Sequence, residues 1–310
     1  MPYSIIKCHF TTSLHVAQER SGGALDTGAF TVRSDTLFSA LCHEAARAGQ
    51  LEALYQAAAQ ERLLLSDMLP FTGDTLWLPR PMLPRQGARS GRYDPSAAKA
   101  LKRLSMLPLD GFQAYLDGLT AEDLASARFH PFFGQAHSAV RAGILGNEQT
   151  LPYRVGQFRF AGGAGLYTVV KADDPRPVTR LMHSLGLSGL GGKRTSGLGR
   201  FEVETMPCPG ALLTALDDGE APWQMLLSTA LPDDDALAQA MDGAYYRLVR
   251  RGGFVASSSF AGGDVKKRTL YMFERGSAFR RRFSGRVHTV AQGSHPVWRL
   301  GTGLFMGVRA

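Results

Sequence analysis

The segment GLSGLGGKRTSGLGR, residues 186–200, combines glycine with cations and hydroxyls in a pattern suited to binding phosphate. Glycine permits backbone conformations closed to other residues and lets a ligand approach the amides. Successive amides then form a concavity for anions, to which Lys193 and Arg194 would add charge-assisted hydrogen bonds. Thr195 and Ser196 supply further donors. The segment therefore predicts a phosphate-binding loop.

Two familiar nucleotide motifs are not satisfied by this loop. A Walker loop needs GxxxxGK followed by Ser or Thr, whereas Lys193 follows Gly192 and precedes Arg194. A dinucleotide GxGxxG would need glycine at Arg194 or at Glu202. A flexible Gly/Ser linker would lack the basic centre. Because the strand-like FEVE follows directly at 201–204, we expect the loop to be ordered.

The N-terminal elements that would position this loop follow from hydrophobic periodicity. Residues 3–16 alternate as a strand, and SDTLFSALCHEAARAG predicts a helix capped by Ser34 or Asp35. A second helical run covers 51–65. The proline-rich stretch 70–95 predicts an extended or looped excursion.

The elements closer to the loop are predicted in the same way. Residues 128–156 have no regular pattern and are expected to be irregular, whereas 157–170 predict a hairpin around its glycines. Residues 178–185 predict a short helix. A strand at 223–231, a helix after Asp233 to Asp235, and strands at 245–259, 268–273, 286–291 and 303–308 follow.

Composition bounds the class of protein. The 310 residues carry a net charge of +8 and 44% hydrophobic residues, which fits a globular chain of two domains. No apolar run approaches a membrane span, and we find no signal peptide. Three scattered cysteines predict a reducing compartment and a cytoplasmic protein. The segment from Arg247 to Arg286 contains eleven basic residues and only two acidic ones, and this excess of positive charge favours a polyanion partner.

Several segments in order resemble one known family. They are SDTLFSALCHE (34–44), the loop leading into FEVE, RRGGFVASSS (250–259), KKRTLYMFERGSAF (266–279) and HPVWRLG (295–301). Together they resemble the RAMP superfamily of CRISPR RNA-binding proteins, and within it the subunit-four family of the type III-A Csm effector complex.

The resemblance implies an α+β fold of two ferredoxin-like (RRM-like) RAMP domains with a glycine-rich loop and irregular insertions. We place the domains at 1–210 and 211–310, with a thumb-like insertion at 129–153. It implies a non-catalytic subunit without a cofactor or metal. This subunit would hold the 5′ repeat-derived tag of the guide RNA (crRNA) and dock the large cyclase-like subunit and the first backbone subunit.

The resemblance also assigns RNA-contacting residues. The first domain would supply the start of the 34–47 helix, the loop and the insertion, and the second domain an arginine pair and a serine run. The residues are Arg33, Ser34, Thr36, Arg141, Tyr153, Arg154, Gly191, Gly192, Lys193, Arg194, Thr195, Ser196, Arg250, Arg251, Ser257 and Ser258.

Two rival functions stay open on sequence alone. A guide-processing endoribonuclease would use a general-base histidine near the N-terminus, and His9, His15 and His43 are available. A nucleic-acid-binding module outside CRISPR would need only the basic segment. Bound bases also require stacking surfaces. The aromatic candidates are Phe30, Tyr153, Phe254 and Trp298, of which Phe254 and Trp298 are expected in the core.

Overall fold

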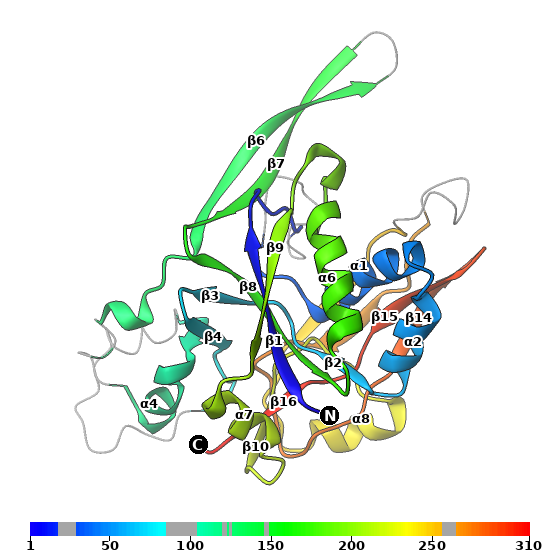
Figure 1. Ribbon diagram of the computed structural model, residues 1–310. Coiled ribbons are helices and arrows are strands. Elements are labelled where there is room, and N and C mark those ends of the chain that lie inside the picture. Colours follow the sequence, from blue (N-terminus) through cyan, green and yellow to red (C-terminus); the bar gives the residue numbers. More distant parts are fainter. Residues whose placement is uncertain (18–28, 85–103, 120–122, 124–125, 146–148, 256–264) are drawn as a thin grey trace.

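The computed structural model describes residues 1–17, 29–84, 104–119, 123, 126–145, 149–255 and 265–310 (Figure 1). Ser257 and Ser258, predicted to contact RNA, lie outside the described residues. The hydrophobic pattern of the N-terminal half produces one large antiparallel sheet. Its strands run in the order β5-β4-β3-β8-β1-β9, with β2 paired to β8. Their bounds are β1 (Tyr3–Phe10), β2 (Leu63–Leu65), β3 (Leu69–Thr72), β4 (Thr75–Pro79), β5 (Met106–Pro108), β8 (Ala164–Ala172) and β9 (Phe201–Pro207).

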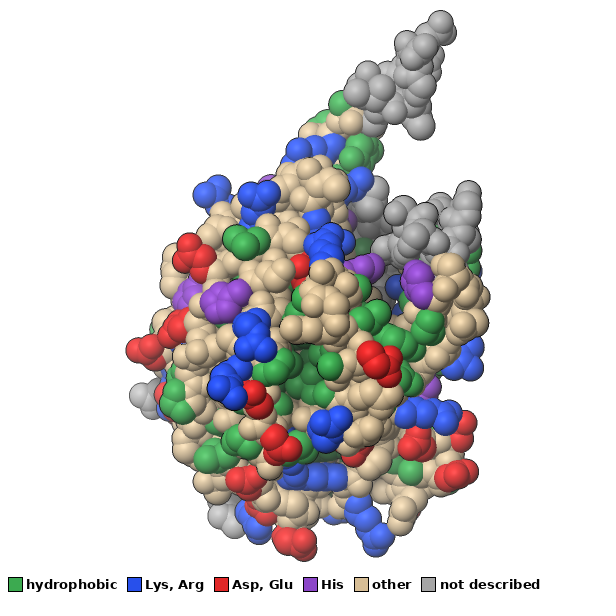
Figure 2. All heavy atoms as spheres, turned by 45° about the vertical axis from the view of Figure 1, so that its right-hand side comes forward, with side chains coloured by type: hydrophobic (Ala, Val, Ile, Leu, Met, Phe, Trp, Pro, Cys, Tyr) green, Lys and Arg blue, Asp and Glu red, His purple; other side chains and the backbone are tan. Residues whose placement is uncertain are grey.

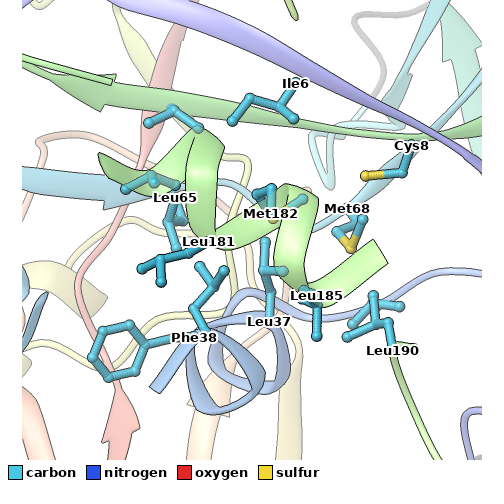
Figure 3. Packing of buried hydrophobic residues seen from close by; sticks show 14 of the residues in the cluster. Ile6, Cys8, Leu37, Phe38, Leu65, Met68, Leu181, Met182, Leu185 and Leu190 are labelled. Carbon is cyan, nitrogen blue, oxygen red and sulfur yellow. The ribbon is translucent and has the colours of Figure 1, made fainter. Parts of the chain in front are cut away.

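Two helices cover one face of this sheet, because each carries a stripe of apolar residues at helical spacing. They are α1 (Ser34–Arg47) and α6 (Arg176–Ser188), with α2 (Leu51–Ala59) beside α1. Figure 3 shows Met182 and Leu185 of α6 between Ile6 and Cys8 of the sheet and Leu37 of α1. This packing holds the C-terminal end of α6, where the glycine loop begins, beside Phe201 at the start of β9.

A small sheet of the C-terminal half packs on the opposite face of the large sheet. Strand β10 (Trp223–Leu226) lies between β13 (Ala278–Phe279) and β16 (Phe305–Val308), and its apolar side chains share a core with Ile5 and Val169. Two antiparallel ribbons complete this half. The ribbons are β11 (Leu248–Arg251) with β12 (Leu270–Phe273) and β14 (Val287–Gln292) with β15 (Pro296–Leu300), and the second ribbon packs against α1 and α2. The described residues also form α4 (Phe112–Asp117) in the N-terminal half and α7 (Gly210–Asp217) and α8 (Asp234–Met241) in the C-terminal half.

Residues 128–156, predicted to be irregular, mostly form a regular ribbon, so that prediction is wrong. Strand β6 (Gly134–Leu145) pairs in register with β7 (Gln149–Phe160), and the hairpin projects from the body (Figure 1). A projecting ribbon buries neither face over most of its length, so its sequence lacks the alternation of a half-buried strand. The hairpin predicted within 157–170 is also wrong, because β7 pairs with β6 while β8 pairs with β1, β2 and β3.

Other predicted boundaries shift by a few residues. The first strand ends at Phe10, and α2 ends at Ala59 before the short strand β2. The proline-rich stretch contains strands β3 and β4, joined by a tight turn at Gly73. Pro79 and Pro108 stand last in their strands, where a missing amide costs little. The predicted helix cap is wrong, since Arg33 occupies the N-cap position without a side-chain cap.

Candidate nucleic-acid interface

The glycine loop is ordered by backbone hydrogen bonds to the segment that follows β1. The amide of Gly192 donates to the carbonyl of His15 at 2.9 Å, and Gly199 donates to Ser13 at 2.9 Å. Across the loop itself, the Leu190 amide donates to the Gly199 carbonyl at 2.9 Å. The loop is therefore an extension of the sheet edge and not a linker.

Several glycines are needed here because backbone approaches backbone. A Cβ on Gly199 would lie 1.9 Å from the Leu190 carbonyl oxygen, and one on Gly191 would lie 2.4 Å from that of His15. Both residues also have positive φ. The Gly192 amide, predicted to face phosphate, is occupied by His15. The glycines thus shape the loop, whose Leu190 and Leu198 side chains are buried while Thr195 and Ser196 are exposed.

Lys193 connects the loop to the projecting hairpin. It adopts a left-handed backbone, φ +58°, and its Nζ donates to the Tyr153 hydroxyl at 3.1 Å while lying 4.6 Å from the Tyr153 ring centroid. Arg154 of the same strand is exposed, and Arg141 pairs opposite Tyr153 in the hairpin register. Figure 2 shows Lys and Arg side chains gathered where the hairpin meets the body. Tyr153 is thus a partner of Lys193 and not an open stacking surface.

A cleft of about 490 Å³ lies beside the loop and is lined by both halves of the chain. The loop contributes Arg194, α1 contributes Thr36 and His43, and the C-terminal half contributes Arg250 and Lys267. Thr195 and Ser196 form the exposed tip of the loop outside this lining. A groove lined by cations from both halves of the chain can bind an extended polyanion such as single-stranded RNA.

The floor of the cleft holds a buried ion cluster around Asp35. Arg251 donates through Nε and Nη2 to the two carboxylate oxygens at 2.9 and 2.8 Å, and Arg299 donates to the same carboxylate. Nη2 of Arg251 also donates to the Thr36 hydroxyl at 2.8 Å. Arg251, predicted to contact RNA, is instead bound to Asp35 and only 13% exposed. Arg299 was not among the residues predicted from the sequence, since no charge cluster surrounds it in HPVWRLG.

A second buried carboxylate locks the start of α1 to the C-terminal half. Asp67 accepts from the Ser34 amide at 2.8 Å, from the Thr229 amide at 2.7 Å and from Arg275 Nη1 at 3.1 Å. Ser34 is fully buried and its hydroxyl donates to the Thr229 carbonyl. Arg33 donates to Glu274 at 3.1 Å. Ser34 and Arg33, both predicted to contact RNA, thus join the two halves, and the burial of Ser34 leaves its side chain no exposed surface.

Among the described residues that line the cleft, the cations not bound to Asp35 are Arg194, Arg250 and Lys267. Arg250 is exposed, whereas Arg194 and Lys267 are half-buried. Burial lowers the pKa of Lys267, and the positive charges of Arg299 and Arg251 lower it further, whereas Asp35 raises it. An anion in the cleft would offset that repulsion. Lys267 belongs to the KK pair at 266–267, so the basic segment was the signal that could have identified it.

The N-terminal histidines differ in their surroundings. His15 is buried, and its Nδ1 hydrogen-bonds the Gly156 carbonyl at 2.6 Å, while His9 pairs with Glu204 at 2.8 Å. Both His15 and His43 line the cleft, and His43 reaches it from α1, which faces Arg194 of the loop. Burial lowers the pKa of His43, and Arg194 and Lys267 lower it further, so this imidazole is neutral at pH 7.

Most of the aromatic stacking candidates are occupied by protein contacts. Phe30 lies 5.5 Å from Phe133 between ring centroids, in a stacked geometry. Trp298 stacks on Tyr55 at 4.2 Å between ring centroids and packs against the core, but it is half-buried and also lines the cleft. Phe254, also expected in the core, is 60% exposed, so that prediction is wrong.

Glu44 fixes the end of α6 from which the loop departs. It is buried and accepts from Ser184 at 2.6 Å, Ser188 at 2.7 Å and Arg47 at 2.9 Å. Burial alone would raise the pKa of Glu44, but the two serine hydrogen bonds and Arg47 outweigh it, so the pKa is lowered. A lowered folded-state pKa contributes stability above the unfolded pKa, and that stability is lost as the pH falls.

We therefore expect Glu44→Gln to lower the free energy of unfolding by about 1–3 kcal/mol at pH 7. The difference from the wild type should shrink below about pH 4.5, because protonation removes the same charge from the wild type. Urea denaturation at pH 7 and pH 4 measures this. Glu52→Gln on the exposed side of α2 is the matched control, and a pH-independent difference would contradict the expectation.

Neither metal chemistry nor a membrane span is indicated in the part of the chain that the structure describes. No group of three or more His, Cys, Asp or Glu side chains within it could hold a metal ion. Likewise, no helix among those residues is long and apolar enough to cross a bilayer.

Comparison with solved structures shows which proteins share this fold. The chain superposes on a chain of the Csm3–Csm4 subcomplex of the type III-A CRISPR-Cas interference complex with a TM-score of 0.68, at 15% identity, covering 99% of this chain and 100% of that one. It matches a chain of the Csm1–Csm4 cassette in complex with cA4 with a TM-score of 0.60 and 18% identity, covering 99% and 98%. The fold is that of subunits of type III CRISPR effector complexes.

Sequence comparison narrows this class to one family. Residues 219–308 match the CRISPR Csm4 C-terminal domain. A Csm4 protein of Mycobacterium tuberculosis is 38% identical over 92% of this chain and 92% of its own length. One from Streptococcus thermophilus is 34% identical over 86% of each. The chain belongs to the Csm4 family of CRISPR proteins.

Proposed function

We propose that this chain is the non-catalytic RNA-binding subunit of a type III-A CRISPR ribonucleoprotein, in which it holds the 5′ repeat-derived tag of the guide RNA. The observation that carries the proposal is the cleft beside the glycine loop. Arg194 enters it from the N-terminal half, and Arg250 and Lys267 enter it from the C-terminal half. Phosphates of a single strand lying between the halves would satisfy all three cations.

The partners follow from the same family assignment. The related chains are found in structures with Csm3 and with Csm1. We propose that this chain docks a backbone subunit and a large cyclase-like subunit of those types. The β6–β7 hairpin is the proposed thumb toward the backbone subunit, because it projects beyond the body and exposes Val140 and Arg154 (Figure 1).

The strand order supports the proposed domain architecture. In β3-β8-β1-β9, α1 follows β1 and α6 joins β8 to β9, which is the order of a ferredoxin-like fold for residues 1–210. For residues 211–310, the central arrangement β16-β10-β13 with α8 following β10 supports a related but smaller sheet.

The function can be tested by purifying the chain from its host through an affinity tag on the protein and sequencing the RNA that is bound to it. RNAs that share a common 5′ repeat-derived end, recovered with a backbone and a large subunit, are the expected result. Recovery of the chain with those proteins but with RNAs lacking a common 5′ end would contradict tag binding.

The endoribonuclease alternative has one observation in its favour, which is neutral His43 beside cations in the cleft. A general base needs that protonation state, and a transition state needs such charges. We expect the purified chain to leave repeat RNA intact. Cleavage products that disappear with His43→Ala, but persist with His183→Ala at an exposed control position, would favour the endoribonuclease function.

A further inference from the structure

The outer face of the β11–β12 ribbon exposes large side chains that the cleft does not use. Because side chains alternate along a strand, Val249 and Met272 point into the protein and are 8% and 0% exposed. Leu248 on the other face is 49% exposed and Tyr271 is 60% exposed. Tyr271 lies directly opposite Arg250 in the register.

The ribbon continues beyond its regular strands with the same composition. Phe254, 60% exposed, forms an antiparallel bridge with Lys266, which is also exposed. In both pairs an aromatic ring lies opposite a cation, Tyr271 opposite Arg250 and Phe254 opposite Lys266. We call these four residues and Leu248 the outer ribbon face. Aromatic surfaces beside a basic track are the usual composition of sites for single-stranded nucleic acid.

The outer ribbon face is continuous with the candidate cleft. Arg250 lines the cleft and also a second groove of about 410 Å³, which runs along β11 past Leu248 to Arg275. A single RNA strand that leaves the cleft at Arg250 therefore reaches the outer ribbon face, where Tyr271 lies opposite Arg250. The acidic neighbour Glu274 is held by Arg33 and Arg247, which neutralise its charge.

We propose that the outer ribbon face stacks bases of the single-stranded RNA that leaves the cleft, with Tyr271 and Phe254 as stacking surfaces and Arg250 and Lys266 as phosphate contacts. The proposal rests on the proposed function and extends its RNA path. It assigns two aromatic residues to the bases, whereas the cleft holds phosphates. Binding by stacking tolerates any base, so these contacts would add affinity and not sequence readout.

A binding titration of the full-length chain with the repeat-tag RNA tests this assignment. Tyr271→Ala with Phe254→Ala should weaken binding by tenfold to a hundredfold, because stacking contributes strongly for each base. The slope of log affinity against log salt should stay unchanged, because no cation is lost. Arg250→Gln should instead lower that slope by about 0.7. Phe132→Ala, also at an exposed ring of 67%, is the matched control and should bind as the wild type does.

An RNA of the same length with abasic sites separates stacking from damage to the protein. The double aromatic variant should bind abasic RNA as well as the wild type does, and Tyr271→Phe should retain affinity for normal RNA. Equal losses on both RNAs would overturn the proposal. So would unchanged RNA affinity combined with loss of a co-purifying protein subunit, since the outer ribbon face would then be a protein interface.

Two further outcomes distinguish a failure of the stacking assignment from a failure of the proposed RNA-binding function. If loop variants at Lys193 and Arg194 lose RNA while the aromatic variants do not, the stacking assignment fails and the RNA-binding function stands. If the wild-type chain binds neither RNA, the proposed function itself fails.

Discussion

Replacement of both Lys193 and Arg194 with glutamate should weaken binding of single-stranded tag RNA by at least about a hundredfold. Each charge-assisted hydrogen bond to phosphate contributes about 1.5–3 kcal/mol, and reversing the charge adds repulsion. Lys193 also anchors the loop to Tyr153 of the hairpin, so the variant separates the loop from β7. The loss should be the same for all RNA sequences, because phosphate contacts do not read bases.

A salt titration by filter binding distinguishes this effect from general damage. The log–log slope should fall by about 1.4, at about 0.7 for each lost phosphate contact, because Lys193 lies between Gly192 and Arg194 at the edge of the cleft and we count it with Arg194 as a contact. Arg176→Glu with Arg180→Glu, at the exposed opposite end of α6, changes the net charge equally and should leave the slope nearly unchanged. A slope that is unaltered in the loop variant would rule out the phosphate contacts.

Replacement of Asp35 with alanine should lower the free energy of unfolding by about 3–5 kcal/mol. The carboxylate is 1% exposed and binds both Arg251 and Arg299, which are themselves 13% and 7% exposed. Without it, two guanidinium groups stay buried with no opposite charge to compensate them. Because the cluster joins α1 to β11 and β15, the loss should also separate the two walls of the cleft.

Urea denaturation of the chain and of Asp74→Ala, at an exposed carboxylate, measures this effect against a matched control. Replacing Asp35, Arg251 and Arg299 together with apolar residues of similar size should restore much of the stability, because the cost lies in unpaired charge. A loss below about 1 kcal/mol in Asp35→Ala would show that the cluster does not hold the halves together.

The spacing of apolar residues predicted the helices, because helix formation depends on residues that are close in the sequence. The apolar spacing of 34–47 and 178–185 correctly identified α1 and the core of α6. The ribbon at 134–160 was not predicted, because its two strands are held mainly by hydrogen bonds to each other and not by burial of one face in a core. Such pairing leaves almost no periodic signal in a sequence.

The glycine-rich composition and basic centre of 186–200, together with the order of the matching segments, determined the family and the place of the loop before a strand. Tertiary structure alone decided which cations face the cleft. Arg250 and Arg251 are neighbours in sequence, yet Arg250 is exposed and Arg251 is bound to Asp35, 216 positions away. Strand alternation turns adjacent side chains to opposite faces, and only the packing of the two halves determines which face meets a buried carboxylate.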